Sequence, residues 1–108
     1  METDVAGWTI EEQDLAQAVF DRALARDVET LIGDLRSRSA ALENPEQLWQ
    51  LHDFLSIRRH EIEGRFDFRL PGLLFVFADF VKDGLVSLEE LEGLSADKLA
   101  KISAMARM

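Results

Sequence analysis

The sequence predicts an all-α protein of about five helices, with two long helices that form a dimeric stalk and a small helical head. Apolar residues recur at spacings of three and four in two long stretches, the pattern of a helix that buries one face. Helix-capping patterns open those stretches. The nearly continuous apolar run at 72–81 has no second strand candidate to pair with. We expect one domain over 1–108, comprising a flexible tail at 1–8, a long-helix dimerisation region at 9–64 and a helical head at 65–108.

Composition narrows the possible functions. The chain has 108 residues, of which 47% are hydrophobic, and this suits one folded domain. The absence of cysteine removes disulfides, thiol catalysis and thiolate zinc sites, and is compatible with a reducing cytoplasm. The net charge of −9 disfavours nucleic acid as a partner. No apolar run approaches the roughly 18 residues of a membrane span. We expect a cytoplasmic protein with no cofactor and no membrane insertion.

The first predicted helix follows the tail. Thr9 and Glu12 form a capping-box pattern. The apolar stripe that follows is Phe20, Leu24, Val28, Leu31 and Leu35. A helix from Thr9 to about Ser37 is roughly 42 Å long, whereas a compact monomer of this size is only about 34 Å across. Because the helix outreaches its own globule, we expect a second copy to cover it in a homodimer.

The second helix is predicted from Pro45 to Glu63, with Asn44 as its N-cap and a stop at Gly64. One of its faces is expected to be core: Leu48, Leu51, Leu55 and Ile62. A second face carries the residue types that are enriched in protein interfaces, with Asp53 and His60 at its edge: Trp49, His52, Ser56, Arg59 and Glu63. We interpret this second face as the functional surface.

Charges on this helix point to a partner. Asp53 and Arg59 are six residues apart, about 240° around the helix, so they can pair only between two chains. A basic cluster stands out against the acidic background and could steer an acidic partner, or could be a solvated helix end: Arg58, Arg59, Arg65 and Arg69.

The head is predicted to hold three shorter helices. Pro71 can open a third helix at 72–81, which Gly84 ends. Capping patterns predict a short helix after Ser87 and a last helix that starts at Ser95 and reaches Met105. The third helix carries three phenylalanines, Phe75, Phe77 and Phe80, and one of them could point outward as a docking knob.

A calcium loop is the alternative to a pure interaction protein. Six residues fall on EF-hand positions 1, 5, 6, 8, 9 and 12: Asp79, Asp83, Gly84, Val86, Ser87 and Glu90. However, Val81 at position 3 offers no side-chain oxygen, and helix stop and capping signals explain the same matches. His52 and His60 do not form an assembled catalytic or metal-binding motif. The pattern favours a non-enzymatic interaction protein over a calcium-binding helical module.

Several strings resemble the cyanobacterial fluorescence recovery protein family. The strings are WQLHDFLS at 49–56, RFDFR at 65–69, LFVFA at 74–78, KDGL at 82–85, LEEL at 88–91 and DKLAKI at 97–102. The resemblance that they carry extends over about two-thirds of the chain. The resemblance implies an α-helical homodimer without a cofactor. It also implies binding to the C-terminal domain of the photoactivated orange carotenoid protein, and faster return of that protein to its inactive orange form. Such activity ends phycobilisome quenching, and it is compatible with a place beside the thylakoid membrane.

The resemblance also implies roles for single residues. Trp49, His52, Asp53 and Arg59 match family positions at or beside the dimer interface. Phe75 and Lys101 match head positions implicated in partner binding, which would make Phe75 the outward knob. Where the family leads us to expect Lys-Tyr-Asp-Tyr-Arg-Tyr-Ser, this chain has RFDFRLP at 65–71, and it contains no tyrosine. A relative with the same fold and a different client, in an organism without phycobilisomes, is the alternative.

Overall fold

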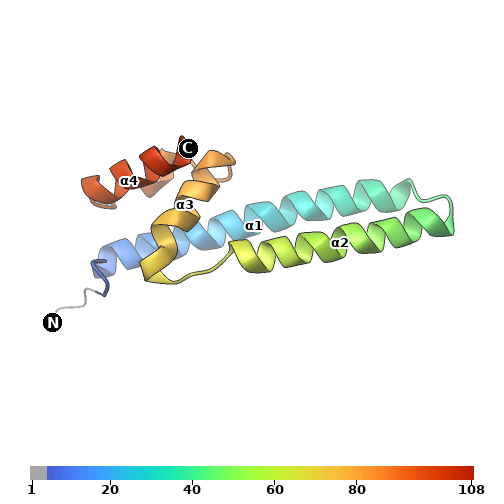
Figure 1. The fold of residues 1–108 in the computed structure, drawn as a ribbon, viewed down its shortest axis with the longest axis horizontal. Coiled ribbons are helices and arrows are strands. Elements are labelled where there is room, and N and C mark those ends of the chain that lie inside the picture. The colour runs from blue at the N-terminus through green and yellow to red at the C-terminus, as the bar shows by residue number, and fades with distance from the viewer. Residues whose placement is uncertain (1–4) are drawn as a thin grey trace.

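The computed structural model describes residues 5–108, and within them it holds helices and no β-strand. The helices are α1 (Ile10–Ala40), α2 (Pro45–Arg65), α3 (Leu73–Lys82) and α4 (Ala96–Ala106), with short 3₁₀ turns η1 (Leu70–Gly72) and η2 (Leu88–Leu91). Figure 1 shows α1 and α2 as a long antiparallel hairpin, with α3 and α4 gathered beside the N-terminal half of α1. The all-α prediction is confirmed. The count of about five becomes four α-helices, because the predicted short helix after Ser87 is the 3₁₀ turn η2.

The two long helices begin where their caps predict. The Thr9 hydroxyl accepts the Glu12 N–H at 3.1 Å, while the Glu12 carboxylate accepts the Thr9 N–H at 3.0 Å. The Asn44 side chain accepts the Gln47 N–H at 2.9 Å. The predicted stop of α2 at Gly64 is wrong: the helix continues to Arg65, and the Phe66 N–H still donates to the Ile62 carbonyl at 3.0 Å. A single glycine in a last turn costs too little to end a helix.

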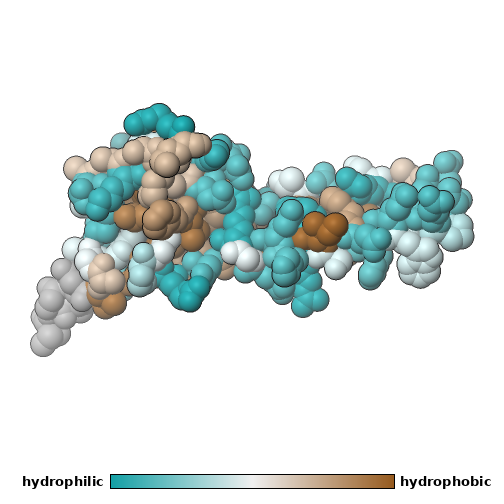
Figure 2. Space-filling model, viewed as in Figure 1, coloured by the Kyte–Doolittle hydropathy of each residue, from teal (hydrophilic) through white to brown (hydrophobic). Residues whose placement is uncertain are grey.

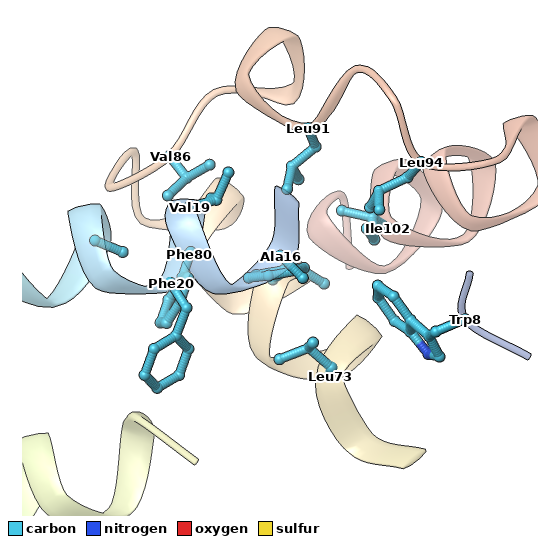
Figure 3. Close-up of a cluster of buried hydrophobic side chains, with 13 residues drawn as sticks. Trp8, Ala16, Val19, Phe20, Leu73, Phe80, Val86, Leu91, Leu94 and Ile102 are labelled. Atoms are coloured by element: carbon cyan, nitrogen blue, oxygen red, sulfur yellow. The ribbon is translucent and has the colours of Figure 1, made fainter. Parts of the chain in front are cut away.

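The core lies in the head and is drawn in Figure 3. Its buried members come from the start of α1, from α3, from the turns that follow and from α4: Trp8, Ala16, Val19, Phe20, Ala23, Leu73, Phe77, Ala78, Phe80, Val86, Leu91, Leu94 and Ile102. Three phenylalanine rings meet at its edge, with Phe20 at 5.5 Å from Phe66 and 5.2 Å from Phe68, both edge to face. These rings close the head against the segment that follows α2.

The prediction of a flexible tail at 1–8 is wrong for Trp8. Its side chain is only 2% exposed and packs in the core, and its backbone pairs with Val5. The Lys98 ammonium lies 5.1 Å from the Trp8 ring centroid and donates to the Gly7 carbonyl at 2.8 Å. The segment before α1 is therefore anchored to α4. The remaining part of the predicted tail, residues 1–4, lies outside the described residues.

A buried ion pair joins the start of α1 to the start of α4. The Glu12 carboxylate accepts the Ser95 N–H at 2.8 Å and the Lys98 ammonium at 3.1 Å. Burial by itself raises the pKa of Glu12, but the N–H groups of Thr9 and Ser95 and the Lys98 ammonium outweigh burial, so its pKa lies below the usual value. The same carboxylate thus caps α1 and positions α4.

The stalk contrasts with the head because its helices cover each other only in part. No residue of α2 is buried, and α1 has no buried residue after Asp27. The predicted core face of α2 is therefore wrong for the single chain: Leu51 and Ile62 are half-buried, whereas Leu48 and Leu55 are exposed. The molecule measures 60 × 29 × 17 Å and has a radius of gyration of 17.3 Å, against about 13 Å for a compact domain of this length. No helix in residues 5–108 is both long and apolar enough to cross a membrane.

Candidate functional site

The outer side of the stalk carries an apolar hollow. Trp49 is 64% exposed, and with His52 it lines a hollow of about 330 Å³ whose other walls are Leu35, Leu48, Leu51 and Leu55. Leu35 comes from α1, and the other residues come from successive turns of α2. This arrangement brings together the predicted functional residues Trp49 and His52, and it shows that the leucines predicted as core belong to the same surface. We call this set, together with Asp53 and Arg59 of the same helix, the stalk face.

The charged residues of the stalk face pair only with near neighbours. The His52 Nδ1 lies 3.4 Å from the Asp53 carboxylate, and the Arg59 Nε donates to the Glu63 carboxylate at 3.3 Å. All four side chains are well exposed, with that of Arg59 at 78%. Asp53 and Arg59 do not pair within the chain, as their spacing predicts. Both therefore remain able to contact a second molecule.

A second exposed face lies on the head. Phe75 is 69% exposed, whereas Phe77 and Phe80 on the same helix are fully buried. The prediction that one phenylalanine points outward is confirmed, and that residue is Phe75. It lines a hollow of about 280 Å³ whose other walls are Ala78, Asp79, Lys82, Met105 and Met108. In Figure 2 apolar surface gathers over the head, and polar surface dominates the stalk.

Lys101 lies on α4, one turn before Met105, which lines the head hollow. The side chains of Lys101 and Met105 therefore share one side of that helix. Lys101 is exposed and forms an ion pair with Asp97 at 3.2 Å. We call the head hollow together with Lys101 the head face. The six predicted site residues fall into two groups, four on the stalk face and two on the head face.

The predicted basic cluster is split by the fold. Arg59 and Arg69 are exposed at 78%, but Arg58 and Arg65 are only 22% exposed. Arg58 Nη2 donates to the buried Asp27 carboxylate at 3.2 Å, and Arg65 Nε donates to Asp79 at 3.0 Å. Half of the cluster is therefore used inside the chain and cannot steer a partner. Sequence reasoning missed Asp27, although a carboxylate one turn after Ala23 on the apolar stripe of α1 is a visible signal.

The geometry is against the calcium alternative. Asp79 and Asp83 bind Arg65, and Glu90 binds Arg22 and Arg26 on α1. Arg26, the Ser87 N–H and Arg22 together lower the pKa of Glu90 to about 2, against a smaller opposing effect of burial. Within residues 5–108 no three acidic or histidine side chains converge as a metal site. The carboxylates that match EF-hand positions are therefore paired with three arginines, two from α1 and one from α2.

Comparisons with known protein families, sequences and structures all find the same kind of protein. A family model described as the photoprotection regulator fluorescence recovery protein matches residues 8–106. The fluorescence recovery protein of Synechocystis sp. is 42% identical over 108 residues, which cover all of this chain and 99% of that protein. The solved structure of the Fremyella diplosiphon fluorescence recovery protein superposes with a TM-score of 0.90 at 44% identity. That of the Synechocystis protein does so with a TM-score of 0.90 at 42% identity. Each superposition covers 94% of this chain and 99% of the other.

Proposed function

Because the chain belongs to the fluorescence recovery protein family of photoprotection regulators, we propose that it binds photoactivated orange carotenoid protein and speeds its return to the inactive orange form. The family is regulatory, so the chain is not an enzyme. The observation that carries the proposal is that the matched region, residues 8–106, contains both exposed faces. The client-facing residue that the family resemblance implies, Phe75, is exposed at 69%, while Phe77 and Phe80 on the same helix are buried.

The proposed mechanism breaks no covalent bond. A regulator of this kind binds the photoactivated client and holds it in conformations closer to the compact one, which lowers the barrier to reversion. Phe75 supplies an apolar knob, and Lys101 supplies a cation beside it. We propose that these two residues contact the C-terminal domain of the client. Closure would end quenching at the phycobilisome, and we expect the encounter to take place in the cytoplasm.

We further propose that the active form is a homodimer built on the stalk face. The large apolar side chains that the two stalk helices expose in the single chain include Ile32, Leu48, Trp49 and Leu55. Burying apolar surface of this kind stabilises association by about 25 cal/mol per Å² before the entropic costs of binding. Asp53 and Arg59 do not pair with each other within one chain. In a two-fold dimer, Asp53 of one chain could pair with Arg59 of the other.

The experiment is the dark recovery of photoactivated orange carotenoid protein, followed by its red-to-orange absorbance change. We expect the chain to accelerate recovery strongly, and Phe75→Ala to remove most of the acceleration without changing helical content. Ile10→Ala is the matched control, because Ile10 is also an exposed apolar side chain but lies on the first turn of α1, on neither face. No acceleration and no binding by the unmodified chain would contradict the proposal and favour a different client for the same fold.

A further inference from the structure

One arginine joins three helices at the junction of stalk and head. Arg65, the last residue of α2, directs each of its three nitrogens to a different carboxylate. Nε lies 3.0 Å from Asp79 and Nη2 lies 2.6 Å from Asp83, both of which belong to α3 or its C-cap. Nη1 lies 3.7 Å from Asp27 of α1. The guanidinium also lies 5.5 Å from the centroid of the Phe80 ring.

Asp27 is the buried end of this arrangement. It is only 7% exposed, and Arg58 donates to its Oδ1 at 3.2 Å. Its Oδ2 has no hydrogen-bond partner among the described residues, because the nearest guanidinium, that of Arg65, is turned toward the carboxylates of α3. A buried carboxylate is costly without cations close by. The buried carboxylate of Asp27 therefore depends on two arginines of α2, Arg58 and Arg65. Arg65 also pairs with the half-exposed carboxylates of Asp79 and Asp83.

These ionic contacts matter for position because α2 has no buried residue of its own. At the C-terminal end of α2 the C-cap Phe66 packs on Phe20 of α1 and Phe80 of α3. Within the helix itself, Arg58 and Arg65 add the ionic contacts to α1 and α3. A guanidinium presents five N–H donors in a rigid planar fork, whereas a lysine ammonium is a compact charge with three rotatable donors on a flexible stem. Arg65 is thus suited to setting an angle between helices as well as neutralising charge.

The junction lies between the two candidate faces. Asp79 follows Phe75 by one turn of α3, and both line the head hollow. Arg58 directly precedes Arg59 of the stalk face. We propose that Arg65 is a positioning residue, which fixes the head face relative to the stalk face so that a client meets both in one geometry. This inference rests on the proposed function for its client, but the relative placement of the faces can be measured without any client.

The first test measures the distance between spin labels on α2 and α4 by pulsed electron paramagnetic resonance. Because the chain has no cysteine, Gln50→Cys on α2 and Ala100→Cys on α4 give two unique, exposed sites for spin labels. Labelled chains are mixed with a large excess of unlabelled chains, so that distances within one chain dominate. We expect a narrow distribution for the parent and a broad one for Arg65→Gln. Arg69→Gln is the control, because Arg69 is exposed and pairs only with its neighbour Asp67, and it should leave the distribution narrow.

Two further variants separate positioning from stability. Asp79→Asn with Asp83→Asn removes the α3 side of the junction while Arg65 and Arg58 still neutralise Asp27, so the chain should fold and the distribution should broaden. Arg65→Lys keeps the positive charge but loses the planar guanidinium. This variant should therefore give a broad distance distribution, although its unfolding temperature should be close to that of the parent. A narrow distribution in both of these variants would overturn the proposal, even if Arg65→Gln fails to fold.

The client assay supplies a readout that a stability role would not move. We expect Arg65→Lys to slow client recovery by about tenfold, the size of effect seen for residues coupled in one ion-pair network. In a chain that already carries Phe75→Ala, Arg65→Lys should add little further loss, because Arg65 acts through the head face. Full additivity would overturn the positioning role. If the parent chain itself does not accelerate recovery, the proposed function fails, while the distance measurement still decides the placement of the faces.

Discussion

The first and second halves of α1 differ in what covers them. Up to Asp27, every third or fourth residue is buried, and the covering comes from α3, η2 and α4 of the same chain. From Val28 to Ala40 no residue is buried, and the only helix alongside is α2, which buries none of its own residues. One continuous helix is thus a core element at its start and an incompletely covered element at its end.

This difference shows that a regular apolar stripe does not by itself make a core. In the head, α1 meets two other helices and a turn, so the side chains on its inward side, among them Ala16, Val19 and Phe20, are enclosed. In the stalk, two helices pack as a single pair, and a pair encloses only the line between them. The apolar residues beside that line, Leu48 and Leu55 among them, stay exposed until another surface arrives. The head therefore covers its own apolar residues, whereas the stalk leaves apolar residues exposed in the single chain.

The largest expected effect breaks the head. Phe77→Ala removes a fully buried ring, and such a change costs about 3–5 kcal/mol of unfolding free energy because a cavity remains. Phe75→Ala on the same helix should cost only about 0.5 kcal/mol, since Phe75 is mostly exposed. Urea unfolding followed by circular dichroism measures both. Equal losses for the two variants would mean that the head is not held by burial of one side of α3.

The next effect concerns the stalk. Trp49→Ala should weaken dimerisation by about 2 kcal/mol, or roughly 30-fold in dissociation constant, because exposed tryptophans in apolar hollows are frequent interface hot spots. Helical content should stay largely intact. Ile57→Ala is the control, since Ile57 is similarly exposed but does not line the hollow. Sedimentation equilibrium gives the dissociation constants, and a chain that is monomeric before any substitution would refute the dimer.

A smaller effect on stability is expected at Glu90, which joins the head to α1 through Arg22 and Arg26. The pKa of Glu90 is lowered from its ordinary 4.5 to about 2. The stabilisation is therefore complete above pH 4.5 and is lost as the pH falls toward 2. Because Arg22 and Arg26 are nearly half exposed, we expect only about 1 kcal/mol at neutral pH. The stability of Glu90→Gln should be lower than that of the parent at pH 7 and should converge with it below pH 3. Parallel pH profiles would contradict this assignment.

The smallest effect on stability is expected at Arg59. Its pair with Glu63 is exposed, so Arg59→Leu should change the unfolding free energy by about 0.5 kcal/mol or less. The same substitution should weaken the dimer or slow client recovery, because Arg59 faces outward. Circular dichroism measures the effect on folding, and the recovery assay measures the effect on activity. A loss of helix on substitution would mean that Arg59 is needed to hold the stalk together.

Local signals in the sequence predicted much of the fold. The caps at Thr9 and Asn44 place the starts of both long helices, and Gly84, with a φ of +74°, ends the third helical segment as expected. The outward position of one phenylalanine followed from three rings on a short helix. Caps and turns act over a few residues, which is why the sequence displays them directly.

Contacts between distant segments needed the tertiary structure. Trp8 reads as part of a tail until Lys98 and the core enclose it. Arg58 and Arg65 read as a surface cluster together with Arg59 and Arg69, because spacing along a helix does not say which arginine meets a carboxylate of α1 or α3. The leucines of α2 read as core, because an apolar stripe specifies a face to be covered and not the element that covers it. Burial and ion pairing are properties of segments brought together from far apart in the chain, so helix periodicity alone could not decide them.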